Sequence, residues 1–415
     1  DPANAVSGTG YFCDTSGGGF TVTLPTSPSA GDIVAVSDYT RTWGANNLII
    51  GRNSKSIGGV AQDAFLTVNG QSATFVFVDD TEGWINTQET QTSQTGQTAS
   101  YVVATGGTPC SGAIVCTNYK VHTFTGPGTL TVSCAGNSAG SNEVSYMVVA
   151  GGGGAGGGNS NFRAGGGGAG GYREGKSPQT PYTASPIACT SGSNNGLPVS
   201  ATPYTIQVGG GGTGAAYPNP GTSPATSGAD SVFSTITSTG GGKGGGYGLD
   251  SGSPPVTHGT PGGSGGGSGG CESYFPSVSP GGSGNTPVVS PAQGFDGGTG
   301  KSSPNPAGPA AAGAGGGGAG AVGSPGAGAA PSIAFGGNGV TTEITASPVA
   351  RAGGGGGGQY AMPGTTPQGG SGGGGNGGYG PPYTPGTAAA TGCAGTPNTG
   401  GGGGGAAGTN NSGGG

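Results

Sequence analysis

The chain has 415 residues and a formal net charge of −6, and it contains 108 glycines and 32 prolines. Residues 146–415 hold 88 of the glycines but only six basic and six acidic residues, so the net charge belongs to the first third. This balance argues against nucleic-acid binding, which uses a basic face, and no apolar run of about 18 residues predicts a membrane span.

Residues 1–90 are expected to form a small all-β module. Phe20–Leu24 alternates apolar and polar residues and ends at Pro25, which is typical of a short strand. Further strands are predicted at residues 32–36, 48–50, 65–68 and 73–78. A module of this size buries only a marginal core, so contact with identical neighbours would stabilise it.

This module resembles one found in structural proteins of marine, cyanophage-type virions. The residues that carry the resemblance are GYFCDTSGGGFTVTLPTSPSAGDIVAVSDYTRTWGANNLIIGRN and SIGGVAQDAFLTVNGQSATFVFVDDTEGW. The resemblance implies a virion fibre protein that works outside the cell. It also implies a homotrimer joined through the N-terminal modules, and contact with other tail-fibre proteins.

A polar linker is predicted at residues 91–100, and a second small β unit at residues 101–149. In this unit the alternating residues 119–125 and 129–132 flank Gly126-Pro127-Gly128, which predicts a hairpin. Residues 144–149 form a last predicted strand that leads directly into the first glycine run.

Residues 150–415 are expected to form a glycine-rich body. The glycine runs lack a strict G-X-Y period, which excludes a collagen triple helix, and their spacing is too irregular for a solenoid. Glycine in the polyproline-II conformation has three residues per turn and no internal hydrogen bonds. Runs of glycine can therefore lie side by side and exchange backbone hydrogen bonds, with Ala155, Ala169 and Ala319 expected in outer rows.

The body resembles the glycine-rich sandwich domain of tail-fibre tip adhesins from T-even-like phages. The resemblance covers residues 144–415 and is carried by YMVVAGGGGAGGG, RAGGGGAGGYR, SVFSTITSTGGGKGGGYG, GGNGVTTEITASPVARAGGGGGG and GGSGGGGNGGYG. It implies stacked polyglycine-II helices whose distal loops touch a receptor on the host outer membrane. The expected fold is thus all-β modules followed by packed polyglycine-II helices, with essentially no α-helix.

Aromatic residues at the turns are the candidate receptor contacts, because aromatic side chains give a large contact area at low entropy cost. If successive runs alternate in direction, the distal turns carry Phe162, Tyr217, Tyr274, Phe275, Phe335, Tyr360 and Met362. The same count places Tyr172, Tyr182, Tyr204, Tyr247, Tyr379 and Tyr383 at the opposite end. Each aromatic could instead be a staple that packs on the glycine helices.

The other chemistry-bearing residues give weak signals. Cys110 and Cys116 could close a short disulfide loop, although buried thiols are the alternative for the seven cysteines. Asp79, Asp80 and Glu82 could hold a cation or simply form an exposed acidic turn. The two histidines lie in no catalytic or metal-ligating arrangement, so neither enzymatic activity nor a metal or other cofactor is expected.

The leading hypothesis is a non-enzymatic distal tail-fibre protein of the virion, acting outside the cell and binding a host outer-membrane protein or surface glycan. It is not expected to insert into a membrane. The alternative is a structural subunit of an extracellular filament, or a virion decoration, whose glycine helices pack between subunits. A third possibility is a disordered linker, because about a third of the residues are glycine or proline.

Overall fold

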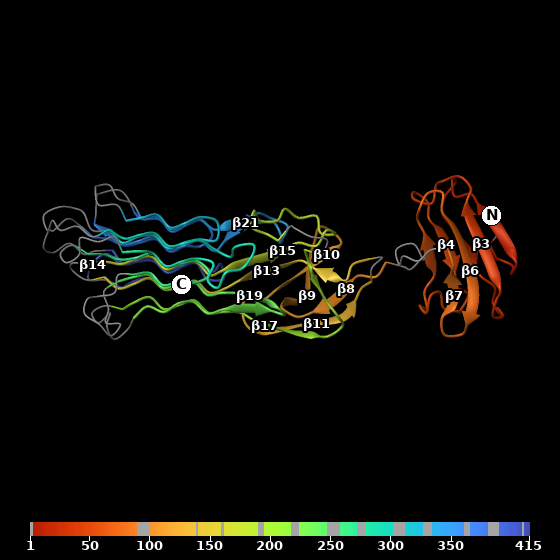
Figure 1. Cartoon of the computed structure of the whole chain (residues 1–415), viewed down its shortest axis with the longest axis horizontal. Helices are drawn as coiled ribbons and strands as arrows, with labels where there is room; N and C mark the ends of the chain where they lie inside the picture. Colours follow the sequence, from red (N-terminus) through yellow and green to blue (C-terminus); the bar gives the residue numbers. More distant parts are fainter. Residues whose placement is uncertain are drawn as a thin grey trace. The chain divides into compact units, whose positions relative to one another are not determined.

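A computed structural model describes most of the chain as β structure and extended segments, in two compact units (Figure 1). Unit 1 comprises Asp1–Val103 and Cys134–Asn142, and unit 2 comprises Ala104–Ser133 and Glu143–Gly415. No helix occurs among the described residues, which are 3–88, 99–137, 140–158, 162–189, 195–216, 224–246, 258–271, 279–301, 312–326, 334–360, 366–380, 390–408 and 411–415. The fold is therefore all-β, as the sequence predicts.

Unit 1 contains two sheets that share one core. One sheet has the order β1 (Thr9–Cys13), β3 (Ile33–Asp38), β6 (Ser72–Asp79) and β7 (Gly83–Asn86). The other has the order β2 (Phe20–Thr23), β4 (Leu48–Gly51) and β5 (Ala64–Leu66). Alternate strand residues point inward, so that Leu48, Phe75 and Trp84 are fully buried in this core, and Trp43 joins them from the turn before β4. The predicted strands of this module are thus present, with β1 and β7 added.

The expected second β unit is not separate from the glycine-rich region. Its strands β8 (Val102–Thr105) and β11 (Gly128–Ala135) join a five-stranded sheet with β17 (Pro203–Gln207), β18 (Ser231–Phe233) and β19 (Ile236–Ser238). The predicted hairpin is wrong, because β10 (Tyr119–Thr123) pairs with β9 (Thr108–Val115) while β11 pairs with β17. Strand partners from far along the sequence replace the local pairing.

Two shorter pairings connect this sheet to the glycine body. β13 (Tyr146–Val149) pairs antiparallel with β15 (Tyr172–Gly175), and β12 (Glu143–Val144) pairs with β16 (Leu197–Pro198). A hairpin of β21 (Val340–Thr342) and β22 (Val349–Arg351) packs nearby, because Val340 shares an apolar cluster with Tyr172, Met147 and Val149. We call this region the β13 end of the body.

The glycine body consists of extended segments that lie side by side and run between the β13 end and β14 (Phe162–Arg163) (Figure 1). Segment 164–171 shows the packing rule. Gly165, Gly168 and Gly171 donate to segment 239–246 at 2.7–2.8 Å, so the same neighbour returns every third residue. This threefold period is that of a polyglycine-II helix.

The same segment has six neighbours. It donates backbone hydrogen bonds to segments 239–246, 312–319 and 400–407. It accepts backbone hydrogen bonds from segments 150–156, 264–267 and 352–358. Segments 312–319, 353–358 and 401–406 exchange hydrogen bonds with six neighbouring segments in the same way. Buried glycine N–H and C=O groups are thereby satisfied between helices rather than within them.

Glycine is required in these inner rows because the backbones approach closely. A Cβ added to Gly167 would collide with the carbonyl oxygen of Gly153, and one added to Gly316 would collide with that of Gly167. Alanine nevertheless occurs inside the body, which corrects the prediction of outer rows. Ala155, Ala169 and Ala319 are fully buried, and the last two join the apolar cluster at the β13 end.

Candidate functional site

The end of the glycine body opposite β13 brings together residues from distant parts of the sequence. β14 pairs with β20 (Gly270–Cys271), and β23 (Gln359–Tyr360) pairs with β24 (Tyr379–Gly380). Isolated bridges connect them to neighbouring segments: Arg163 to Ala407, Lys301 to Ala312, and Ala312 to Gln359. We call this region the β14 end.

Many chain segments start and stop at the β14 end. Gly246 lies beside Gly157, Ala215 donates to Ala155, and Gly300 exchanges backbone hydrogen bonds with Ser279. The β14 end therefore brings together the ends of several described segments of the glycine body.

The structure describes three of the candidate receptor contacts. Phe162 lies at the β14 end but is only 7% exposed, so its ring packs as a staple. Phe335 is 42% exposed, yet its carbonyl accepts from Ser324, which places it along the flank of the body. Tyr360 lies at the β14 end through its pairing in β23. Four candidates lie outside the described residues, namely Tyr217, Tyr274, Phe275 and Met362.

The expected sorting of aromatics by chain direction is only partly correct. Tyr172 and Tyr204 lie at the β13 end, in β15 and β17, as predicted. Tyr379 does not, because β24 pairs with β23 at the β14 end. The count took residues 369–378 as one run, but the chain turns at residues 371–373, and Gly374 donates back to Gly370. The count also missed a return segment at 224–230, which has a single glycine, Gly228. An outer segment needs glycine only where it faces a neighbour, and here a Cβ on Gly228 would collide with the carbonyl of Gly151.

A buried carboxylate organises the β13 end. The Glu174 side chain is 3% exposed and accepts hydrogen bonds from Tyr172 Oη (2.8 Å), the Ser185 amide (3.0 Å) and Thr342 Oγ1 (2.6 Å). These donors come from β15, the loop after it and β21, so one side chain ties three elements together. Burial, and then the Glu174 charge, raise the pKa of Tyr172.

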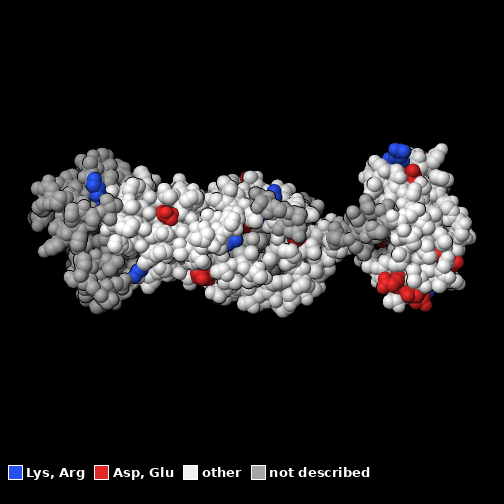
Figure 2. Space-filling model, in the orientation of Figure 1, with Lys and Arg blue, Asp and Glu red and all other residues white. Residues whose placement is uncertain are grey.

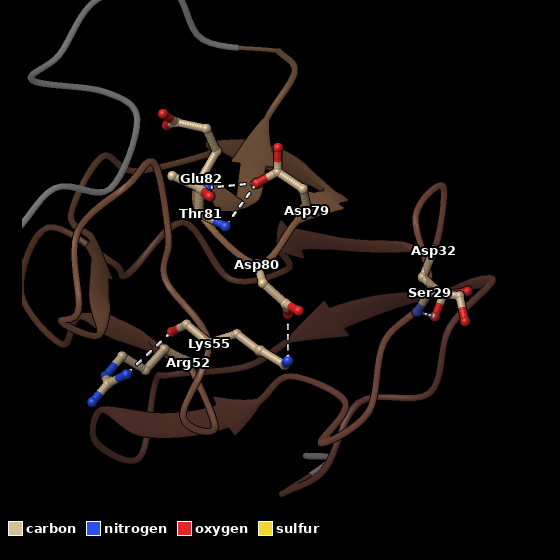
Figure 3. A network of polar contacts seen from close by, with 8 residues as sticks. All are labelled: Ser29, Asp32, Arg52, Lys55, Asp79, Asp80, Thr81 and Glu82. Atoms are coloured by element: carbon tan, nitrogen blue, oxygen red, sulfur yellow. Dashed lines mark hydrogen bonds and ion pairs between the residues drawn. The ribbon is translucent and has the colours of Figure 1, made fainter.

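The acidic turn of unit 1 is a structural turn rather than a cation site. Asp79 Oδ1 accepts from the amides of Thr81 (2.8 Å) and Glu82 (2.7 Å), and Lys55 Nζ lies 2.6 Å from Asp80 Oδ1 (Figure 3). The carboxylates are thus directed to backbone and to a lysine. In the part of the chain that the structure describes, no three His, Cys, Asp or Glu residues cluster as metal ligands would.

The cysteines do not form the predicted short loop. Cys110 and Cys116 are both free and exposed. Most of the chain between them belongs to β9, and six extended residues span on the order of 15–20 Å, far beyond the ~5.5 Å between the Cα atoms of a disulfide. The disulfide prediction is therefore wrong, and Cys134, Cys189 and Cys393 are free as well.

The charged side chains of unit 2 are few and scattered. On the face shown in Figure 2, the Lys, Arg, Asp and Glu residues described over the glycine body lie singly among uncharged ones. Among the described residues, no helix is long and apolar enough to cross a membrane. Of the two histidines, His122 Nδ1 lies 2.8 Å from the Gly106 carbonyl, and His258 is exposed.

Comparison with known proteins identifies a family through the glycine body. A search of curated proteins found no match. The family model of a glycine-rich domain matches residues 123–415, which include the hairpin β18–β19, the β13 end and every described segment of the glycine body. Since this match covers well over half of the sequence, the chain belongs to the glycine-rich domain family.

Proposed function

We propose that the chain is the distal, receptor-binding part of a phage tail fibre, acting outside the cell and without enzymatic activity. The observation that carries the proposal is the construction of the β14 end. Pairs and bridges there join residues as distant as Arg163 and Ala407, and successive glycine helices run to it from the β13 end. Such a body brings the ends of many chain segments together on one rigid face, and rigid scaffolds present recognition loops in this way.

The receptor contacts would come from the loops that connect at the β14 end. Tyr217, Tyr274, Phe275, Tyr360 and Met362 remain the proposed contacts, since each adjoins or follows a segment that reaches this end. Tyr379 joins them, because it is 46% exposed in β24. The proposed partner is a host outer-membrane protein or surface glycan, with unit 1 joining three copies and other fibre proteins.

The outer rows of the body favour the display of recognition loops over growth into a filament by lateral packing of more glycine helices. Exposed residues recur every third position on the outer segments, and most carry side chains: Pro280, Ser283 and Thr286; Val322 and Pro325; Phe335 and Asn338; Gln368 and Ser371. A side chain in an outward row keeps another glycine helix from close approach. Lateral packing therefore stops at these faces.

Adsorption to cells tests the proposal. The labelled chain should bind cells of the bacterium on which the virus grows and should reduce infection when added first. Tyr379→Ala should weaken adsorption, whereas Val288→Ala, an 85% exposed residue in the loop that hydrogen-bonds near the β13 end, should leave it unchanged. A wild-type chain that neither adsorbs nor competes contradicts the proposal.

The alternative is a filament subunit, and one face favours it. Gly210 and Gly211 are exposed on segment 209–216, and a Cβ on Gly210 would meet no atom within 4 Å. Light scattering separates the two functions. The adhesin should keep one mass over a hundredfold range of concentration, whereas a filament subunit should grow with concentration. If it does grow, Gly210→Val should stop it.

A further inference from the structure

Unit 1 has an open hollow of about 590 Å³ that no part of the proposed function uses. Its volume falls within the ~300–1,000 Å³ typical of small-molecule sites. The hollow is lined by Asp14, Ser16, Gly17, Gly18, Phe20 and Thr21, together with Ala3. Apart from Ala3, these residues belong to the turn that follows β1 and to the start of β2.

The polar side of the hollow is preorganised. Asp14 Oδ1 accepts hydrogen bonds from the Ser16 amide (2.8 Å) and from Thr40 Oγ1 (3.0 Å), which hold the carboxylate in place. The hydrogen bonds from the Ser16 side chain and backbone lower the pKa of Asp14, so it stays ionised near neutral pH. The Ser16 and Thr21 hydroxyls add groups that both donate and accept.

The apolar side of the hollow is a single ring. Phe20 is partly buried and packs against the core of unit 1, which fixes its position, while it also lines the hollow. The space beside Gly17 and Gly18 is open, since a Cβ added to either would meet no atom within 4 Å. Backbone groups of the turn are therefore accessible beside the aromatic ring.

We propose that this hollow binds one uncharged sugar ring. A carboxylate and two hydroxyls exchange hydrogen bonds with sugar hydroxyl groups, and the negative face of a phenyl ring attracts the C–H groups of a pyranose. A metal ion would need several oxygen ligands, and the lining holds one carboxylate. The inference deepens the proposed function, on which it rests for the source of the sugar, a host surface glycan.

Binding to the full chain tests the proposal, measured by saturation-transfer NMR and titration calorimetry. The probes are methyl glycosides of glucose, mannose, galactose and N-acetylglucosamine, with butylammonium as the charged comparison. We expect at least one glycoside to bind. Asp14→Asn should weaken binding about tenfold, the loss of one charge-assisted hydrogen bond.

Gly17→Leu should abolish binding by filling the hollow without touching the core. Gly126→Leu is the matched control, because Gly126 lies in unit 2 and its Cβ also meets open space. The proposal is overturned if no glycoside binds, if butylammonium alone binds, or if Gly17→Leu binds as wild type does. Adsorption to cells that survives Gly17→Leu, without glycoside binding, would overturn the sugar site and leave the adhesin function standing. Glycoside binding by a chain that does not adsorb to cells would support the sugar site and contradict the adhesin function.

Discussion

Gly167 shows at the scale of one residue why glycine is required inside the body. Its amide donates to the Gly403 carbonyl at 2.8 Å, and its carbonyl accepts from Gly355 at 2.9 Å. The direction in which a Cβ would leave the α-carbon is blocked by the Gly153 carbonyl, with which a methyl group would collide. Three helices meet at one α-carbon, so the entropic cost of ordering glycine is offset by hydrogen bonds that no other residue permits.

Gly167→Ala is therefore expected to destabilise the body by about 1–3 kcal/mol, the usual cost of overpacking. Denaturant unfolding of the full chain measures the change. Gly126→Ala is the control, because its Cβ meets no atom and its φ lies outside the left-handed region, and it should change stability by less than ~0.5 kcal/mol. Equal stability of the two variants would show that the inner rows are not tightly packed.

Cys13 offers a second test at this scale. The thiol is fully buried in unit 1, and burial raises its pKa to about 11. It should resist a thiol reagent at pH 8 while exposed Cys110, Cys116 and Cys393 react. Because the folded pKa exceeds that of the unfolded chain, its contribution to stability is present below about pH 9 and is lost toward pH 11. Rapid native-state labelling of Cys13 would contradict this.

At the scale of elements, Glu174 joins parts that are far apart in sequence. Its three hydrogen bonds reach β15, the following loop and the β21–β22 hairpin. Glu174→Ala should leave these buried donors unpaired and cost about 3 kcal/mol or more. Hydrogen exchange in residues 340–351 reports the change, and Glu343→Gln, a half-buried neighbour, is the control. Unchanged protection of the hairpin would show that Glu174 does not hold it.

The sequence predicts elements better than it predicts their partners. Alternation located β2 to β6 of unit 1, because each strand buries one face against the same core. It did not reveal that β11 pairs with β17, since nothing local encodes a partner about 75 residues away. Segment 224–230 was missed for a physical reason: an outer helix needs few glycines, so a count of glycine runs overlooks it.

The candidate site was predicted less well than the fold. The β14 end was expected to carry Phe162 and Tyr360, and both lie there. Burial of Phe162 and the flank position of Phe335 could not be read from spacing, because both depend on which helices surround them. Tyr379 was misplaced because residues 369–378 were counted as one run, whereas the chain turns at residues 371–373 and reverses direction before it reaches Tyr379.

At the scale of the whole molecule, the account depends on glycine runs behaving as a solid core. Segment 164–171 contacts six neighbours drawn from residues 150 to 407, so the body cannot form piecemeal. A disordered linker and a folded display body have the same composition, and only the hydrogen bonds between runs distinguish them. The proposed role of the β14 end has no basis if those bonds are absent.

Amide hydrogen exchange in residues 165–171 and 313–319 of the intact chain tests this claim most directly. Each of these amides donates to a neighbouring helix, so exchange should be slower than in an unstructured peptide by on the order of a thousandfold or more. Exchange at the rate of an unstructured peptide in both segments would contradict the account.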